Sequence, residues 1–319
     1  MLKTYHSYYD NGASRHDRAM PVSEDRIHME NRKRIIPAAV ILVVLVCVAA
    51  FSYKYIGSKK WNGLTVADLD VGKADAAVIT CGDITGIIDT GTGDAYDIID
   101  SYLKRFGDSD IEFMILSHYD KDHIGSAAKI IREYPVGSIY LPDYVSEKEY
   151  YPVLMEAVKD RDNVFYVDQK ETVTYGDIKI VFYPPSDPAS ILENGEKPDN
   201  NMSLMCMLSY GDNRLLFTGD IEKARIKQIM DSDVSRSDEL DADWIKIPHH
   251  GKYQKAEKDL LELTTPVYAV ISTSEDEAPN EKLIKLLADE GIETYGTVSG
   301  NIITLCDKNT MSVSVVPAS

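Results

Sequence analysis

The apolar positions of the chain follow two different patterns. Residues 35–51, IIPAAVILVVLVCVAAF, contain no charged side chain, and two further uncharged residues extend this run to residue 53. A helix needs roughly 17–25 apolar residues to cross a bilayer, so the run predicts a transmembrane anchor over residues 35–53. After residue 61 the apolar runs are short, rich in β-branched residues and separated by turns with Gly and Asp, which is typical of a folded domain.

Two other interpretations of the 35–53 run are weaker. A cleaved signal peptide has an apolar region of about 7–15 residues and a small-residue cleavage site, whereas Ala49-Ala50-Phe51 is a poor site. A helix buried in a soluble domain is disfavoured because the run has no polar face. The polar segment 1–34 has mixed charge and no apolar periodicity, so we expect a short, poorly ordered tail.

Basic residues on both flanks bear on the topology of the predicted anchor. Residues 32–34, Arg-Lys-Arg, precede the run directly, and the positive-inside rule then places the tail in the cytoplasm and the rest of the chain outside. Lysines at positions 54, 59 and 60 weaken this asymmetry. A cytoplasmic domain with the tail outside is therefore the alternative.

Residues 61–319 alternate predicted strands with predicted helices, with no internal linker and no strong repeat. Strand runs dominate first and then alternate with helices, and this cycle occurs roughly twice. The pattern predicts one α/β domain of layered mixed sheets with external helices. The helices are expected at 97–106, 126–133, 147–159, 222–230, 257–263 and 281–289, a hairpin at 203–218, and a polar loop at 186–200.

Charge and cysteine content narrow the chemistry. The net charge is −18, with 34 Lys and Arg against 52 Asp and Glu. Residues 1–60 carry +5 and residues 61–319 carry −23, so a basic nucleic-acid footprint is absent at the level of net charge. The four cysteines are far apart and form no CxxC motif, which disfavours a zinc ribbon or a disulfide scaffold. Any metal would therefore be held by histidines and carboxylates.

Three segments carry that type of ligand at the ends of apolar strands. The first is Ser117-His118-Tyr119-Asp120-Lys121-Asp122-His123, which places His118, Asp120, Asp122 and His123 within six residues. The second is Thr218-Gly219-Asp220, and the third is Pro248-His249-His250-Gly251. Imidazole and carboxylate groups suit Zn²⁺ or Mn²⁺. An Asp at a strand end can also cap the next helix, and paired histidines can be solvated, but three such segments together favour a metal site.

The order HxDxDH, TGD and HHG resembles the metallo-β-lactamase fold hydrolases, in particular the branch of the soluble domain of the DNA-uptake competence protein ComEC. The resemblance covers nearly all of residues 64–308. It includes Asp70-Val71-Gly72-Lys73-Ala74-Asp75-Ala76, the Ile88–Gly91 stretch and the Asn200–Leu204 stretch. The lactamases proper show HxHxDH, whereas Asp120 stands at the second histidine here, which argues against antibiotic hydrolysis.

The resemblance implies an αββα sandwich with two divalent metal ions, Zn or Mn. It implies that His118 and Asp120 serve the first ion, that Asp122 and His123 serve the second, and that Asp220 bridges both. Either His249 or His250 would complete the ligands, and strand alternation does not choose between them. Asp122 and Asp220 are the predicted catalytic residues. Asn201, Ser203 and Lys252 are candidate substrate contacts.

These features predict a membrane-anchored, extracytoplasmic metallohydrolase, most consistent with a phosphodiesterase. The substrate classes are a nucleic acid, a nucleotide or a cell-envelope polymer, and no dedicated protein partner is inferred. The alternative is a binding or regulatory module that keeps the fold without turnover. It is suggested by Ala278-Pro279, where the resemblance leads one to expect His-Pro, and opposed by the six intact metal-type positions. Lys73-Ala74 in place of Gln-Gly is a further departure from the family pattern.

Overall fold

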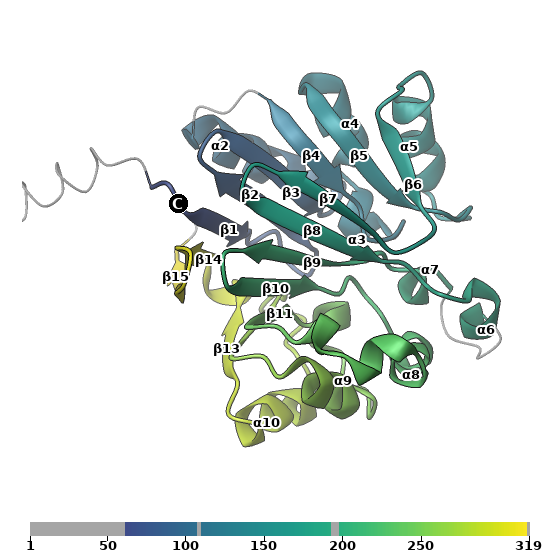
Figure 1. Cartoon of the computed structure of the whole chain (residues 1–319). Coiled ribbons are helices and arrows are strands. Elements are labelled where there is room, and N and C mark those ends of the chain that lie inside the picture. Colours follow the sequence, from purple (N-terminus) through teal and green to yellow (C-terminus); the bar gives the residue numbers. More distant parts are fainter. Residues whose placement is uncertain (1–60, 107–109, 193–197, 318–319) are drawn as a thin grey trace, which may run out of the picture. The chain divides into compact units, whose positions relative to one another are not determined.

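Two β-sheets lie face to face, with helices on both outer sides (Figure 1). The computed structural model describes residues 61–106, 110–192 and 198–317. The first sheet has eight strands in the order β15-β14-β1-β2-β3-β4-β5-β6. Their bounds are β1 Leu64–Asp68, β2 Ala76–Cys81, β3 Ile84–Thr90, β4 Ile111–Ile115, β5 Val136–Pro142, β6 Val164–Val167, β14 Asn301–Cys306 and β15 Met311–Val316.

The second sheet has seven strands in the order β13-β12-β11-β10-β9-β8-β7. Their bounds are β7 Glu171–Tyr175, β8 Ile178–Tyr183, β9 Met205–Tyr210, β10 Asn213–Phe217, β11 Trp244–Lys246, β12 Tyr268–Ile271 and β13 Glu293–Gly296. The predicted hairpin is confirmed, since β9 and β10 pair antiparallel with Tyr210 opposite Asn213.

The helices cover the outer faces of the two sheets and so give four layers. Helices α2 Tyr96–Phe106, α3 Lys121–Ile124, α4 Ala127–Glu133 and α5 Tyr151–Val158 belong to the first sheet's side. Helices α8 Lys223–Asp231, α9 Glu257–Thr264 and α10 Glu281–Asp289 cover the second sheet. The α/β sandwich that the resemblance implied is therefore confirmed (Figure 1).

The strands read as nearly continuous apolar runs because both faces of each sheet are covered. In β10, Leu215 and Phe217 face the core between the sheets, whereas Leu216 packs beneath the helices of the second sheet. Three reduced cysteines, Cys81, Cys206 and Cys306, are buried in the core between the sheets. Successive side chains along a strand point to opposite faces of its sheet. The apolar strands therefore supply the core between the sheets and a second apolar layer between each sheet and its helices.

Parallel strands bring the ligand-bearing segments to one place. Strands β3, β4, β5 and β6 run parallel in the first sheet, and β10, β11, β12 and β13 run parallel in the second. Polar segments follow the carboxyl ends of β4, β10 and β11. In parallel sheets these ends share one edge, which is where ligands commonly bind.

One predicted helix starts later than expected, and one predicted loop contains helices. The helix expected at 147–159 begins only at Tyr151, with Pro152 in its first turn; a proline is well placed there but disfavours helix before it. The expected loop 186–200 contains two short helices, α6 Pro188–Leu192 and α7 Pro198–Asn201. Each starts at a proline, which is a helix-start signal.

No helix among the described residues has both the length and the hydropathy to span a bilayer. The predicted tail 1–34 and the predicted anchor 35–53 lie outside those residues.

Candidate metal centre

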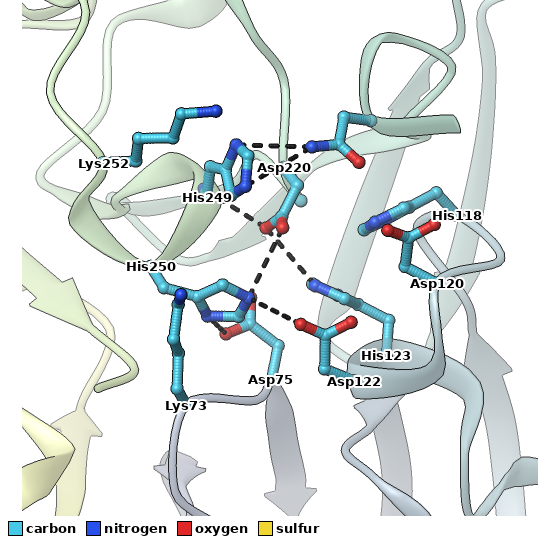
Figure 2. A network of polar contacts seen from close by, with 12 residues as sticks. Lys73, Asp75, His118, Asp120, Asp122, His123, Asp220, His249, His250 and Lys252 are labelled. Atoms are coloured by element: carbon cyan, nitrogen blue, oxygen red, sulfur yellow. Dashed lines mark hydrogen bonds and ion pairs between the residues drawn. The ribbon is translucent and has the colours of Figure 1, made fainter. Parts of the chain in front are cut away.

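The segment after β4 turns back on itself and buries two imidazoles. Strand β4 ends at Ile115, and the chain then passes through Ser117 and His118 into the short helix α3, which carries His123. The side chains of both histidines have no solvent exposure. Figure 2 shows them side by side, facing Asp220 from the opposite segment.

Asp89 and Ser117 orient both of these imidazoles. The Oδ1 atom of Asp89 accepts the Ser117 backbone N–H at 2.7 Å, and its Oδ2 atom accepts the Ser117 hydroxyl at 2.7 Å. His123 Nδ1 lies 2.7 Å from Asp89 Oδ2, and His118 Nδ1 lies 3.0 Å from Ser117 Oγ. These contacts favour a proton on each Nδ1, which leaves both Nε2 lone pairs available to a metal.

Asp220 reaches the same place from the second sheet. It follows Gly219, whose φ is +56° and where a Cβ atom would come within 2.9 Å of Ser117 and Ser203 side-chain atoms. Only glycine fits this turn. The Asp220 carboxylate lies between two imidazoles, with Oδ1 3.3 Å from His123 Nε2 and Oδ2 3.4 Å from His250 Nε2. It is therefore in contact with imidazoles from both sheets at once.

His249 and His250 point in different directions. His250 is 3% exposed, and its Nε2 atom lies 3.4 Å from Asp122 Oδ2 as well as from Asp220. His249 turns away, with Nδ1 2.9 Å from Glu222 Oε1 and 3.3 Å from Asn200 Nδ2. Both histidines have a positive φ, of 50° and 52°. This left-handed backbone, rare for residues other than glycine, is what separates the two rings.

Asp75 and Lys246 complete the cluster from beneath. Asp75 Oδ1 lies 3.4 Å from His250 Nδ1 and 2.8 Å from Lys246 Nζ. Both partners of this ion pair are nearly fully buried. Burial alone would raise the pKa of Asp75, but the Lys246 charge and His250 together hold it below its ordinary value. Asp75 therefore stays ionised beside His250.

The other ionisable groups of the cluster are also shifted. Burial, reinforced by His123, lowers the pKa of His118 to about 4, so this imidazole is neutral. Burial would lower the pKa values of His123 and His250, but Asp220 and neighbouring carboxylates outweigh it and raise both well above 6.5. Asp122 has a pKa of about 2, because contacts with these imidazoles outweigh its burial. Without a metal, the cluster holds protons that a metal would displace.

The donor set fits divalent ions. The Nε2 atoms of His118, His123 and His250 are buried and have no hydrogen-bond partner. Side-chain donors lie within 4.8 Å of one another in four groups: His118, His123 and Asp220; Asp122, His123 and His250; Asp75, Asp220 and His250; and Asp75, Asp89 and His123. Buried imidazoles and carboxylates converging in this way are the ligand types that zinc and related metals take.

Asp120 and the predicted substrate residues lie differently. The carboxylate of Asp120 forms an ion pair with Lys148 at 2.6 Å and belongs to none of the four donor groups found among the described residues. Asn201 Oδ1 accepts the backbone N–H groups of Glu222 and Arg225. The Ser203 hydroxyl donates to the Asn200 carbonyl and accepts the Asp220 N–H. Both of these side chains are buried and hold the loops in place.

Lys252 is the most exposed of the predicted substrate residues, with its Nζ 2.9 Å from Glu222 Oε1. Sequence reasoning assigned no role to Asp75, Asp89, Ser117, Lys148, Asn200, Glu222 or Lys246, although Ser117 and Asn200 stand within two of the motifs. Asp75 and Asp89 stand in the two turns that support the resemblance, and this is the one signal that pointed to them.

Proteins of known family resemble this chain in sequence. The sequence matches the metallo-beta-lactamase superfamily over residues 69–275. It is 26% identical over 223 residues to ComE operon protein 3 of Bacillus subtilis (strain 168), covering 68% of this chain and 27% of that protein. It is 27% identical over 236 residues to Recombination protein 2 of Haemophilus influenzae, covering 72% and 26%. The chain thus spans about a quarter of the length of these ComEC-type competence proteins.

The solved structure of CmlA agrees with this fold. CmlA, a diiron beta-hydroxylase from Streptomyces venezuelae, superposes with a TM-score of 0.50 at 11% identity, covering 78% of this chain and 55% of that one. The metallo-beta-lactamase fold protein YhfI from Bacillus subtilis has a TM-score of 0.49 at 12% identity, covering 76% and 100%. The match over residues 69–275 spans more than half of the chain, and the chain therefore belongs to the metallo-beta-lactamase superfamily.

Proposed function

We propose that this chain is a dinuclear metal-dependent phosphodiesterase, anchored in a membrane by residues 35–53 with its hydrolase domain, 61–319, outside the cytoplasm. The observation that carries the proposal is the place of Asp220, whose two oxygens face His123 and His250 at 3.3 and 3.4 Å. One carboxylate between two sets of donors is the arrangement that a pair of ions needs.

The residues divide into two sets around Asp220. His118 and His123 would hold one ion, zinc or manganese, and His250, Asp122 and Asp75 the other. This moves His123 from the second ion, where the resemblance places it, to the first, because it shares a donor group with His118 and Asp220. Asp120 stays a predicted ligand of the first ion. In this structure its carboxylate is paired with Lys148. A metal pair supplies a water of lowered pKa and polarises the phosphoryl oxygens. His249 is not proposed as a ligand, because its ring faces Glu222 and Asn200.

Three groups of the chain serve the reaction itself. Asp122 is the least buried carboxylate of the cluster and is ionised at neutral pH, so it can orient an attacking water. Asp89 and Ser117 fix the imidazole rings. Lys252 is the proposed contact to a phosphate oxygen, because its ammonium group is exposed beside the site (Figure 2). Asn201 and Ser203 act by shaping the loops rather than by touching substrate.

The substrate class is a phosphodiester of a nucleic acid, a nucleotide or a cell-envelope polymer. The competence-type relatives favour DNA. The charge of −23 on residues 61–319 opposes tight binding of a polyanion except through the metals and nearby lysines. The same fold supports other chemistry in CmlA, so the reaction rests on the site and not on the fold.

The adjacent histidines give a matched test. The full chain, purified in detergent with Zn²⁺ or Mn²⁺, is expected to hydrolyse bis-p-nitrophenyl phosphate. His250→Ala should lower kcat/KM by roughly 100-fold or more, and His249→Ala by less than about tenfold. Equal losses in the two variants would contradict the assignment of His250.

Metal analysis of the same samples separates catalysis from the alternative of a binding module. Two metal ions per chain with metal-dependent turnover support the proposal. Two ions per chain without turnover of phosphodiesters would support the binding module instead. A wild-type chain that takes up no metal would overturn both the dinuclear site and the mechanism.

A further inference from the structure

A cavity of about 290 Å³ lies on the outer side of the second sheet, beside α8. Its apolar wall includes Met205, Ile229, Val234 and Leu240. Its charged lining residues are Arg225, Lys170 and Asp168, and Lys170 is already paired with Glu239. The volume is near the lower end of the range for small-molecule pockets. No candidate ligand of the metal centre lines it.

Arg225 is a buried cation without a counter-charge. It is 3% exposed, and among the described residues no carboxylate lies within ion-pair distance of its guanidinium. Burial alone lowers its pKa to about 9. Lys246, the other buried Lys or Arg side chain in the described part of the chain, is paired with Asp75 at 2.8 Å. A charged side chain removed from water is costly unless it is paired.

The guanidinium is held in place but not satisfied. One terminal nitrogen donates to the Tyr183 carbonyl at 2.9 Å, and the other donates to Gln228 Oε1. Gln228 is itself fixed, because its Nε2 atom donates to the Asp187 carbonyl at 2.8 Å. The Nε atom of Arg225 has no partner. The pocket therefore contains an oriented, desolvated cation with donor capacity to spare.

We propose that this pocket binds a small amphiphilic anion, whose acidic group pairs with Arg225 and whose apolar part lies against Met205, Ile229, Val234 and Leu240. Pairing with the anion offsets the desolvation cost of the Arg225 charge. Burial of a hydrocarbon group against the apolar wall adds favourable free energy of binding. The site is separate from the metal centre, because Arg225 points to the end of β8 on the helix-covered face of the second sheet.

Four probes test both halves of the proposal on the full chain in detergent, with EDTA present so that the metal centre does not bind phosphate. Hexanoate and hexyl phosphate carry an acidic group and a hydrocarbon chain, whereas inorganic phosphate and hexanol each carry one feature. We expect calorimetric binding of hexanoate, hexyl phosphate or both, and binding of the single-feature probes at least about tenfold weaker. Comparison of the first two shows whether the ligand is a carboxylate or a phosphate ester.

Variants locate the binding. Arg225→Gln should weaken it at least about tenfold, and Val234→Trp, which fills the cavity and leaves Arg225 in place, should do the same. Arg214→Gln is the matched control, since Arg214 already donates to the carbonyls of Asp238 and Glu239. Binding unchanged in both pocket variants, hexanol bound as tightly as hexanoate, or no binding of any probe would overturn the proposal. None of these outcomes depends on hydrolytic activity.

Discussion

Three residues at the metal centre hold a backbone conformation that side chains normally avoid. Asp89, His249 and His250 have φ values of 54°, 50° and 52°. Among the described residues, one further non-glycine, Thr265, has a positive φ. Such strain costs of order 1–3 kcal/mol for each residue and persists only where the surrounding structure enforces it. The separation of the two histidine rings therefore reduces stability.

A pair of variants at His249 measures this strain. His249→Gly and His249→Ala remove the same contacts with Glu222 and Asn200, but only glycine adopts a φ of +50° without steric cost. We expect the glycine variant to be more stable than the alanine variant by roughly 1 kcal/mol in urea unfolding. Lys252, with φ −70°, is the control position, where alanine should be at least as stable as glycine. Equal stability of the two His249 variants would contradict the strain.

Much of the site could be predicted from single residues, and part of it could not. His118, Asp122, His123 and Asp220 stand in short motifs that show their residue types directly. Whether His249 or His250 faces the cluster depends on the φ angles of these two residues. The sequence shows two identical neighbouring residues and gives no sign of these angles. Asp75 and Lys246 are 171 residues apart, so their ion pair follows only from the stacking of the two sheets.

At the scale of elements, prediction worked where an amphipathic pattern is long. The helices at 97–106 and 281–289 were predicted because their apolar positions recur with helical spacing, and α2 and α10 confirm them. The four-residue helices α3 and α7 are too short to show a period. Their presence depends on the turns around the site, which local propensity does not determine.

The start of α9 gives a pH-dependent prediction. Burial raises the pKa of Glu257 from 4.5 to about 7, and its Oε1 atom has no partner. The folded state therefore keeps a proton that the unfolded state releases, and stability falls as the pH rises from about 4.5 to 7. Glu257→Gln should raise the free energy of unfolding by roughly 3–3.5 kcal/mol at pH 8, at about 1.4 kcal/mol per pKa unit, and by much less at pH 5.

The control lies on the same helix. Glu262 is exposed and pairs with Lys258 four residues earlier, so Glu262→Gln should change the free energy of unfolding by less than about 1 kcal/mol at either pH. A Glu257→Gln gain that is the same at pH 5 and pH 8 would show that the carboxylate is not the cause.

At the scale of the whole molecule, the candidate metal centre takes its residues from both sheets. His118, His123 and Asp122 follow strands of the first sheet, whereas Asp220 and His250 follow strands of the second. A bound ion would therefore link the two halves, and a ligand that binds only the folded state stabilises it. We expect saturating Zn²⁺ or Mn²⁺ to raise the Tm of EDTA-treated protein by roughly 5–10 °C at pH 8.

The same increase should be smaller at pH 6. The pKa values of His123 and His250 are raised, so the stability that their protonation contributes is present below about 6.5 and is lost as the pH rises through the folded-state values. Metal must also displace these protons. Both effects widen the gap between metal-bound and metal-free protein at higher pH. His123→Ala should lose the shift, and an equal shift in that variant would contradict the site.

The predicted anchor concerns the whole chain as well. We expect the full chain to sediment with membranes and to resist extraction by carbonate, because a run of nineteen uncharged residues favours the bilayer. A variant with lysine at positions 42 and 46, within this run, should remain in the soluble fraction. A wild-type chain that is washed from membranes by carbonate would overturn the anchor.

The three buried thiols of the sandwich have a practical consequence. Burial raises the pKa values of Cys81, Cys206 and Cys306, so these side chains are protonated and react slowly with alkylating reagents. With Cys47 replaced by serine, a single cysteine placed at the 82% exposed Val145 would be the one fast-reacting group in a native chain. A maleimide that cannot cross membranes would then label intact cells only if the domain faces outward. Because the buried thiols react only slowly, labelling of this one cysteine would report the membrane topology of the chain.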